Sequence, residues 1–191
     1  MLKVGITGGI GSGKSLVSKI LQSMNFPVFY SDLEAKKIIQ ENKEVKEKLI
    51  ALFGAKIFLN NQLNRTYFAG IIFSDNEALK KVNAIVHPLV RWEFEEFAKN
   101  QTSDFVFNEA AILFESGGHK QMDKVVLVSA PEEMRIERVM KRDEVTKDQV
   151  IERMSNQWSD EQKRQLADFE IINDETHALI HQIEKMLNSL G

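Results

Sequence analysis

The residues with the clearest chemical meaning lie near the start of the chain, in the stretch GGIGSGKS from Gly8 to Ser15. This stretch fits the pattern G-x-x-x-x-G-K-[ST], in which glycines let successive backbone N–H groups converge on phosphate oxygens. Lys14 can bridge the β- and γ-phosphates of a nucleoside triphosphate, and the Ser15 hydroxyl can bind Mg²⁺. The alternative is a glycine-rich turn that binds no ligand. An apolar strand before the stretch and an amphipathic helix after it favour nucleotide binding.

The identity of the nucleotide can be narrowed by a comparison with N-K-x-D, the motif with which switch-type GTPases recognise guanine. The Asn-Lys pair of this sequence is Asn42-Lys43-Glu44-Val45, which has no aspartate in the fourth position. We therefore expect ATP as the nucleotide and Mg²⁺ as its metal ion. The residues expected to bind ATP are those of the loop and of the following helix start: Gly9, Ile10, Gly11, Ser12, Gly13, Lys14, Ser15 and Leu16. Ser15 is the expected metal ligand.

Three arginines form a second candidate group. Arg135, Arg138 and Arg142 recur every three to four residues, so they share one face of a predicted helix. In small phosphotransferases, which the length and layout of this chain resemble, a lid carries arginines onto the transferring phosphate. The alternative is a solvated basic face. With a phosphate loop in the same chain, we expect catalytic roles for Arg138 and Arg142, and ATP contact by Arg142.

Asp32 follows the second predicted strand, at the sheet edge where ligands of open α/β sheets bind. A carboxylate there can accept the proton of a substrate hydroxyl or hold a water molecule of Mg²⁺. It can equally be a helix cap, because Ser31 or Asp32 would cap a helix that begins near Leu33. The residues alone leave these interpretations open.

Short apolar strands alternate with helical patterns along the whole chain. Strands are predicted at residues 2–6, 27–30, 105–107, 125–128 and 169–172, and helices include 33–52, 64–73, 77–86, a fresh start after Pro88 to residue 99, and one starting at Pro131. Thr146 and Ser159 each open a capping box. This order predicts an α/β fold of three layers, the P-loop NTPase fold, with a mainly parallel five-stranded sheet. We expect one domain over 1–191, with a helical insertion at about 60–100 and a helical lid at about 131–156.

The composition is that of an ordinary globular protein. The 191 residues include no cysteine, carry a net charge of −3 and hold no apolar run near the roughly 20 residues that span a bilayer. A cytoplasmic protein is expected, because disulfides and thiolate metal sites are excluded. The charge argues against nucleic acid as a partner, and no membrane partner is expected. Oligomeric state is left open.

Taken together, these features resemble the dephospho-CoA kinase family, and the resemblance covers essentially the whole chain. It rests on motifs in the family's order: GITGGIGSGKS, Asp32, Leu63-Asn64-Arg65 leading to Ile72-Phe73, Ile85-Val86-His87-Pro88-Leu89-Val90, Ile112-Leu113-Phe114-Glu115, Arg138 to Arg142-Asp143, and Ile171-Ile172-Asn173. The family phosphorylates the ribose 3′-hydroxyl of dephospho-CoA with ATP, which gives CoA and ADP. Three departures are Tyr30-Ser31-Asp32 in place of D-A-D, Ala111-Ile112-Leu113 in place of P-L-L, and Leu16 where Thr is common after the serine of the phosphate loop.

The resemblance implies roles for individual residues. Asp32 takes the role of the catalytic carboxylate. The substrate-binding residues implied are Asp32, Arg65, His87, Arg91 and Glu115, and Asn173 is expected near the adenine. Plain alternatives remain for His87 as a helix-end residue, for Arg91 as a surface residue and for Asn173 as a turn residue. The rival functions are a nucleoside or nucleoside-monophosphate kinase and, from another class, a nucleotide-dependent switch module.

Overall fold

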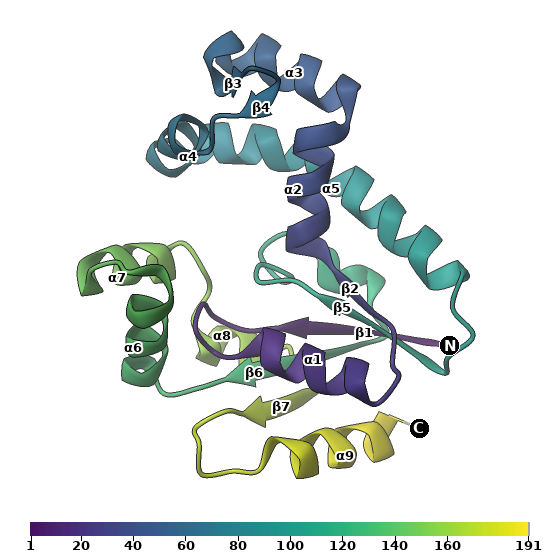
Figure 1. The fold of residues 1–191 in the computed structure, drawn as a ribbon. Helices are drawn as coiled ribbons and strands as arrows, with labels where there is room; N and C mark the ends of the chain where they lie inside the picture. Colours follow the sequence, from purple (N-terminus) through teal and green to yellow (C-terminus); the bar gives the residue numbers. More distant parts are fainter. Residues whose placement is uncertain (191) are drawn as a thin grey trace. The chain divides into compact units, whose positions relative to one another are not determined.

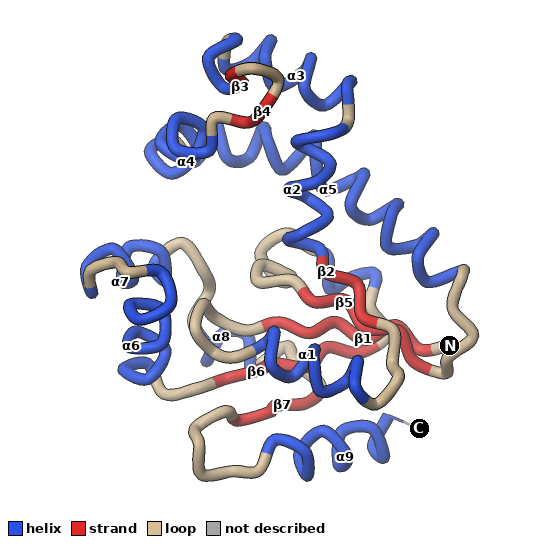
Figure 2. Tube along the Cα trace, viewed as in Figure 1, coloured by secondary structure: helices blue, strands red, loops and turns tan. Residues whose placement is uncertain are grey.

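Five short strands form the central sheet of the computed structural model, which describes residues 1–190. They are β1 (Leu2–Thr7), β2 (Val28–Tyr30), β5 (Phe105–Glu109), β6 (Lys124–Ser129) and β7 (Phe169–Ile172), in the spatial order β2-β5-β1-β6-β7. Every neighbouring pair is parallel. Figure 2 shows the strands in red. The strands are nearly continuous apolar runs because both faces of the sheet are covered. The predicted fold class is confirmed.

The sheet's register brings its carboxyl ends to one edge. Ile6 pairs with Glu109, and Tyr30 pairs with the same glutamate from the other side. On the opposite side of β1, Thr7 pairs with Leu127. The phosphate loop, which follows β1, therefore emerges at the edge where the other strands end.

Helices cover both faces of this sheet (Figure 1). On one face lie α1 (Lys14–Ser23) and α9 (Leu179–Leu190), which contact each other and bury Val17, Leu21, Ile183 and Met186 against the strands. On the other face lie α8 (Asp160–Arg164), which contacts β6, and a short 3-10 helix (Gly118–Gln121). Burial of these apolar stripes supplies the main drive for the arrangement.

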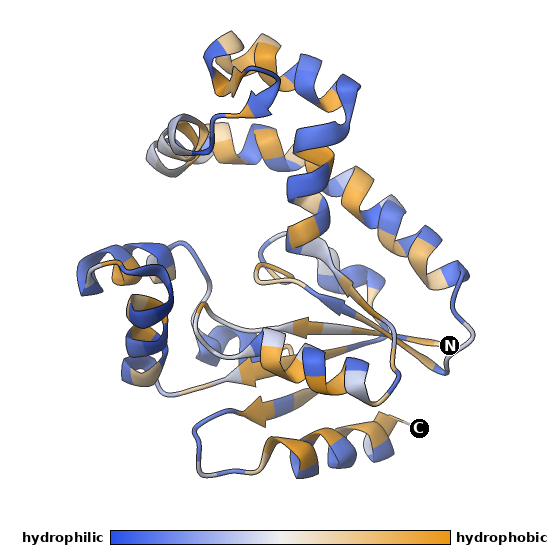
Figure 3. Ribbon diagram, viewed as in Figure 1, coloured by the Kyte–Doolittle hydropathy of each residue, from blue (hydrophilic) through white to orange (hydrophobic). Residues whose placement is uncertain are grey.

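Two further helices, α6 (Glu132–Asp143) and α7 (Lys147–Ser155), pack on each other beside the sheet edge. Most of their residues are hydrophilic, as the blue ribbon in Figure 3 shows, and the two helices share a small core of Ile136, Val139 and Val150. The capping boxes predicted at Thr146 and Ser159 are both present. Pro131 is the N-cap residue of α6, so the helix begins at Glu132, one residue later than predicted.

The sheet and these helices belong to one of two compact units, which we call the core unit (Met1–Tyr30 with the chain from Asn100 onward). The helical unit is Ser31–Lys99. Its elements are α2 (Ser31–Glu41), α3 (Lys43–Phe53), a 3-10 helix (Ala55–Ile57), β3 (Phe58–Leu59), β4 (Gln62–Leu63), α4 (Arg65–Ser74) and α5 (Asn76–Lys99). This unit begins well before the boundary near residue 60 that the sequence pattern suggested.

Two local predictions in the helical unit were wrong. The helix predicted over 33–52 is two helices, because Asn42 ends one and caps the next by accepting a hydrogen bond from the Val45 N–H at 3.0 Å. The predicted break before Pro88 does not occur, and α5 runs through it. Buried Val86 and Val90 continue one apolar stripe on both sides of the proline, so packing outweighs the one lost hydrogen bond. The chain between α3 and α4 also contains the β3–β4 hairpin.

Asn64 caps α4 as predicted, since its side chain accepts a hydrogen bond from the Tyr67 N–H at 3.3 Å. Of the helices among residues 1–190, none is both long and apolar enough to cross a membrane.

Candidate functional site

The loop between β1 and α1 has the backbone shape that a phosphate cradle requires. Gly11 and Gly13 lie in the left-handed region, with φ of 79° and 97°. A Cβ on Gly13 would collide with the Asn173 side-chain amide, and a Cβ on Gly11 would press on the backbone of Arg135. Any other residue at these positions would be strained and would also clash with a neighbouring element. The fold therefore requires glycine at both of these positions.

Lys14, the first residue of α1, is buried against the loop. Its ammonium group lies 2.9 Å from the carbonyl oxygen of Gly8 and 3.3 Å from that of Gly9. This places a positive charge at the N-terminus of α1, where the helix dipole also favours anions. The loop thus combines backbone N–H groups, a helix end and one lysine, which together suit phosphate oxygens.

Ser15 lies beside a carboxylate that the sequence reasoning missed. Its hydroxyl donates to Oε1 of Glu109, the last residue of β5, at 3.3 Å. The signal was an acidic residue closing an apolar strand, FVFNE, next to the strand that carries the phosphate loop. Burial, and then the Glu109 carboxylate, raises the pKa of the Tyr30 hydroxyl above its ordinary value of 10.0, so this hydroxyl stays protonated. It donates to Gln22 at 2.9 Å.

The donor set around Ser15 fits Mg²⁺. A hydroxyl and a carboxylate are hard oxygen ligands, and Mg²⁺ needs few protein ligands because it keeps several waters and binds phosphate oxygens. Within residues 1–190, no group of three or more His, Cys, Asp and Glu side chains forms a metal cluster of its own. The hydroxyl of Ser15 and the carboxylate of Glu109, next to the phosphate loop, suit a metal ion that also binds phosphate oxygens.

Two of the three arginines of α6 join this loop around one cavity. The cavity has a volume of about 200 Å³ and is lined by Gly11, Gly13, Lys14, Ser15, Arg138, Val139 and Arg142. Arg138 donates to the Asn173 carbonyl oxygen at 3.1 Å and to Glu175 at 3.0 Å. Arg142 donates to Asp143, with its Nε 2.7 Å from Oδ1. A cavity with one lysine and two arginines in its wall has the charge to receive a polyphosphate.

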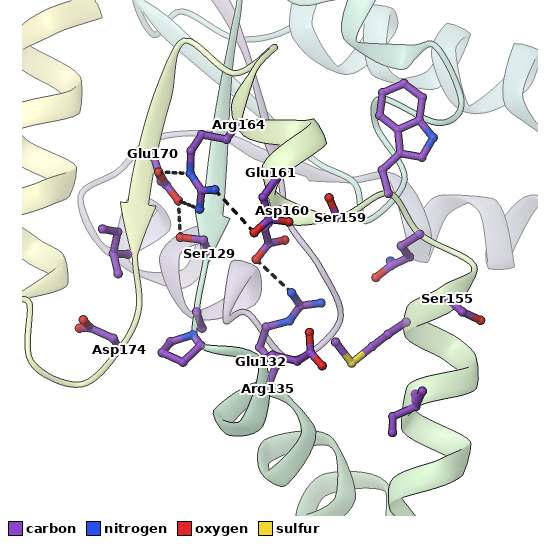
Figure 4. A pocket seen from close by; sticks show the side chains of 17 residues that line it. Ser129, Glu132, Arg135, Ser155, Ser159, Asp160, Glu161, Arg164, Glu170 and Asp174 are labelled. Carbon is purple, nitrogen blue, oxygen red and sulfur yellow. Dashed lines mark hydrogen bonds and ion pairs between the residues drawn. The ribbon is translucent and has the colours of Figure 1, made fainter.

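Arg135 has a different environment from the other two. It lies on the wall of a separate cavity of about 780 Å³, where it pairs with Asp160 at 3.0 Å (Figure 4). Its Nε also donates to the Ile10 carbonyl oxygen at 3.0 Å. Only 8 % of Arg135 is exposed. This arginine therefore supports the phosphate loop through its bond to Ile10 and does not line the cavity beside Lys14.

Asn173 also supports the loop. Its side-chain amide donates to the Ser12 carbonyl oxygen at 2.8 Å, and both residues are buried. The Ser12 hydroxyl is a buried polar atom that has no hydrogen-bond partner among the described residues. The predicted contact of Asn173 with adenine stays a prediction, as does the ATP contact of the half-exposed Leu16.

Glu115 lies in the loop after β5 and takes part in a buried ion pair. Its Oε1 lies 3.1 Å from the ammonium group of Lys163, whose side chain is 0 % exposed, and accepts from the Trp158 N–H at 2.9 Å. Lys163 was missed, because a lysine in the helix DEQKR gives no sign of burial. The predicted substrate contact of Glu115 stays a prediction.

The remaining predicted substrate residues lie in the helical unit. Asp32 is exposed in the first turn of α2, which starts at Ser31, earlier than predicted. His87 and Arg91 lie on α5, which packs on α2. Burial and then the Arg91 charge lower the pKa of His87 below 6.5, while the Asp32 charge opposes them. The helical unit thus brings these three together, whereas Arg65 is exposed at the start of α4.

Comparison with known proteins adds an independent finding. A family model described as dephospho-CoA kinase matches residues 2–178. A dephospho-CoA kinase from Bacteroides fragilis is 40% identical over 187 residues, which cover 97% of this chain and 91% of that protein.

Two solved structures are also similar to this chain. A crystal structure from Thermus thermophilus has a TM-score of 0.85 at 33% identity and covers 99% of this chain and 95% of its own. A dephospho-CoA kinase from Campylobacter jejuni has a TM-score of 0.70 at 28% identity, with coverage of 98% and 96%. The family model and these matches extend over nearly the whole chain and include its phosphate loop. The chain therefore belongs to the dephospho-CoA kinase family.

Proposed function

We propose that the protein transfers the γ-phosphoryl group of ATP to the ribose 3′-hydroxyl of dephospho-CoA, which forms CoA and ADP in the last step of coenzyme A biosynthesis. The observation that carries this proposal is the cavity that Lys14 and Ser15 of the phosphate loop line together with Arg138 and Arg142. Family membership supplies the acceptor. We also propose the cytoplasm as its compartment, with no nucleic-acid or membrane partner.

The reaction requires positioning and charge stabilisation more than covalent chemistry by the protein. The 3′ oxygen forms a bond to the γ-phosphorus, the bond from that phosphorus to the ADP oxygen breaks, and its electron pair leaves with ADP. Lys14 neutralises charge on the β- and γ-phosphate oxygens. Arg138 and Arg142 add positive charge where it develops in the transition state. Ser15 and Glu109 would hold Mg²⁺, which would neutralise further charge on the phosphates.

The acceptor hydroxyl needs a group that orients it and takes its proton. We assign this role to Asp32, the carboxylate that follows the carboxyl end of β2 by two residues. We assign binding of dephospho-CoA to Arg65, His87, Arg91 and Glu115. In this proposal the helical unit carries the acceptor pocket, and α6 with α7, residues 131–156, forms the lid that excludes water from ATP.

A coupled ADP-release assay tests the function. Purified protein with ATP and Mg²⁺ is given dephospho-CoA, adenosine, AMP or CMP at matched concentrations. We expect dephospho-CoA to give a kcat/KM at least about tenfold above the others, which corresponds to about 1.4 kcal/mol in transition-state binding. Equal turnover of AMP or CMP would instead identify a nucleoside-monophosphate kinase. ADP release that does not depend on any small acceptor would indicate a switch module.

A further inference from the structure

Residues outside the phosphate loop bind the backbone of Ile10, at both its N–H and its carbonyl oxygen. The Ile10 N–H donates to the side-chain oxygen of Gln157 at 2.9 Å. The Ile10 carbonyl oxygen accepts from Arg135 at 3.0 Å. Its side chain packs against the apolar cluster shared by α6 and α7. The direction of the peptide planes on either side of Ile10 is therefore set by residues far away in the sequence.

Gln157 is itself held in place by its neighbour in the chain. It lies between α7 and α8, and the N–H of the next residue, Trp158, donates to Glu115. The Trp158 ring lies parallel to the Phe114 ring, with an interplanar angle of 2° and 6.3 Å between centroids. The same loop after β5 thus holds Trp158 by its backbone and by its ring.

The buried pair of Glu115 and Lys163 stabilises this attachment. The Lys163 ammonium group lies 3.1 Å from Glu115 and 3.5 Å from the Ala111 carbonyl oxygen. A charge taken fully out of water is retained only when it is paired and hydrogen-bonded. Movement of Trp158 would remove a donor from Glu115, whose second oxygen is buried with no hydrogen-bond partner in the described chain. The segment before α8 therefore has one strongly preferred position.

We propose that Gln157 is a positioning residue for phosphoryl transfer, which holds Ile10 so that the loop N–H groups point at the ATP phosphates. The pair of Glu115 and Lys163 fixes the segment from which Gln157 reaches the loop. This proposal rests on the proposed function, because it requires the loop to bind ATP. Gln157 needs no contact with substrate for this role, since it acts through the Ile10 N–H.

The variant Gln157→Met tests the proposal, because it keeps the length of the side chain and removes the acceptor oxygen. We expect the KM for ATP to rise about 3- to 10-fold, the range for loss of one neutral hydrogen bond, while the KM for dephospho-CoA changes by less than about twofold. Gln157→Glu keeps an acceptor oxygen and should restore ATP binding toward that of the parent. Direct titration with ATP measures the same effect without turnover.

Gln162→Met is the matched control. The Gln162 side chain accepts from the Ser159 N–H at 2.9 Å, so it makes the same kind of bond at the same distance, but at the start of α8. We expect this variant to lower the melting temperature about as much as Gln157→Met and to leave ATP binding unchanged.

The proposal is overturned if Gln157→Met binds ATP as the parent does, or if Gln162→Met shows the same loss of ATP binding. It is also overturned if Gln157→Glu binds ATP as weakly as Gln157→Met. Failure of the parent protein to phosphorylate dephospho-CoA would refute the proposed function instead. In that case the ATP titrations still decide whether Gln157 positions the loop.

Discussion

Arg135 and Arg142 lie on the same helix, α6, and we expect the loss of Arg135 to lower mainly stability and the loss of Arg142 to lower mainly turnover. Arg135 is almost fully buried in an ion pair with Asp160, whose side chain is 11% exposed. One oxygen of Asp160 is already buried with no hydrogen-bond partner within residues 1–190. Replacing Arg135 with Met would leave this carboxylate buried and uncompensated, which destabilises proteins by about 3–5 kcal/mol. For a chain of this length, about 2–4 °C is lost per kcal/mol, so we expect a Tm lower by roughly 6–20 °C.

The loss of Arg142 should lower turnover much more than stability. Its side chain is 61% exposed, and its bond to Asp143 is a surface ion pair, worth about 0–1 kcal/mol. Arg142→Ala should therefore melt within about 4 °C of the parent. If Arg142 stabilises the transferring phosphoryl group, its loss should lower kcat by about 10³–10⁵, the range for arginines that act in phosphoryl transfer. Binding of dephospho-CoA should change far less.

The assay pairs a thermal melt with saturating ADP-release kinetics, at a temperature well below every Tm. Arg153→Ala is the matched control, because Arg153 pairs with the same Asp143 at 2.8 Å and does not line the cavity beside Lys14. It should melt like Arg142→Ala and keep its turnover. The reasoning is refuted if Arg135→Met melts like the parent, or if it loses more turnover than Arg142→Ala.

Three further changes test other parts of the site. Lys14→Ala should lower kcat by two or more orders of magnitude, about 3 kcal/mol or above. The control Lys19→Ala, on the exposed side of α1, should keep the kcat of the parent. A kcat of Lys14→Ala within about threefold of the parent would exclude a catalytic phosphate loop. Asp32→Asn should leave the Tm unchanged and lower kcat by about 10²–10⁴ if Asp32 is a general base, while unchanged turnover would return Asp32 to a helix cap. Because the folded state lowers the pKa of His87, protonation favours the unfolded state. Stability should be greatest above pH 6.5, decline as the pH falls from there toward the lower folded-state pKa, and level off below it. Urea melts should show a weaker decline for His87→Gln but not for His181→Gln, an exposed histidine of α9.

The features that the sequence predicted well depend on partners close in the chain. The capping boxes at Thr146 and Ser159 join residues three positions apart, so the pattern contains both partners. The phosphate loop is similar, since its glycines and Lys14 lie within a few residues of each other. The strands were recognisable because burial on both faces demands continuous apolar runs.

The two errors in the helical unit have different causes, packing at Pro88 and a local helix cap at Asn42. Pro88 removes one hydrogen bond from α5, but the stripe through Val86 and Val90 stays buried on both sides of it. Asn42 interrupts a helical pattern because its side chain satisfies the start of the next helix. At Pro88 the local signal for a break was real, but burial of the apolar stripe stabilises the continuous helix by more than the proline destabilises it.

Helical spacing placed the three arginines on one face of α6, but it could not say what each one meets. Arg138 and Arg142 line the cavity with Lys14, whereas Arg135 supports the phosphate loop by donating to the Ile10 carbonyl oxygen. The distinction depends on Asp160, which the chain reaches only after α7. One periodic pattern therefore contains two physical roles, and only the fold separates them.

The residues that hold the loop show why a motif does not make a site by itself. Gln157 lies 147 residues from Ile10, and Lys163 lies 52 residues from the Ala111 carbonyl oxygen it approaches. Neither belongs to a pattern with its partner, and Lys163 sits in a short helix where a lysine is expected to face water. Yet the N–H groups of a phosphate loop are useful only when they point in one fixed direction. A chain with GGIGSGKS but without Arg135 and Gln157 would keep every donor of the loop and lose the contacts that aim them.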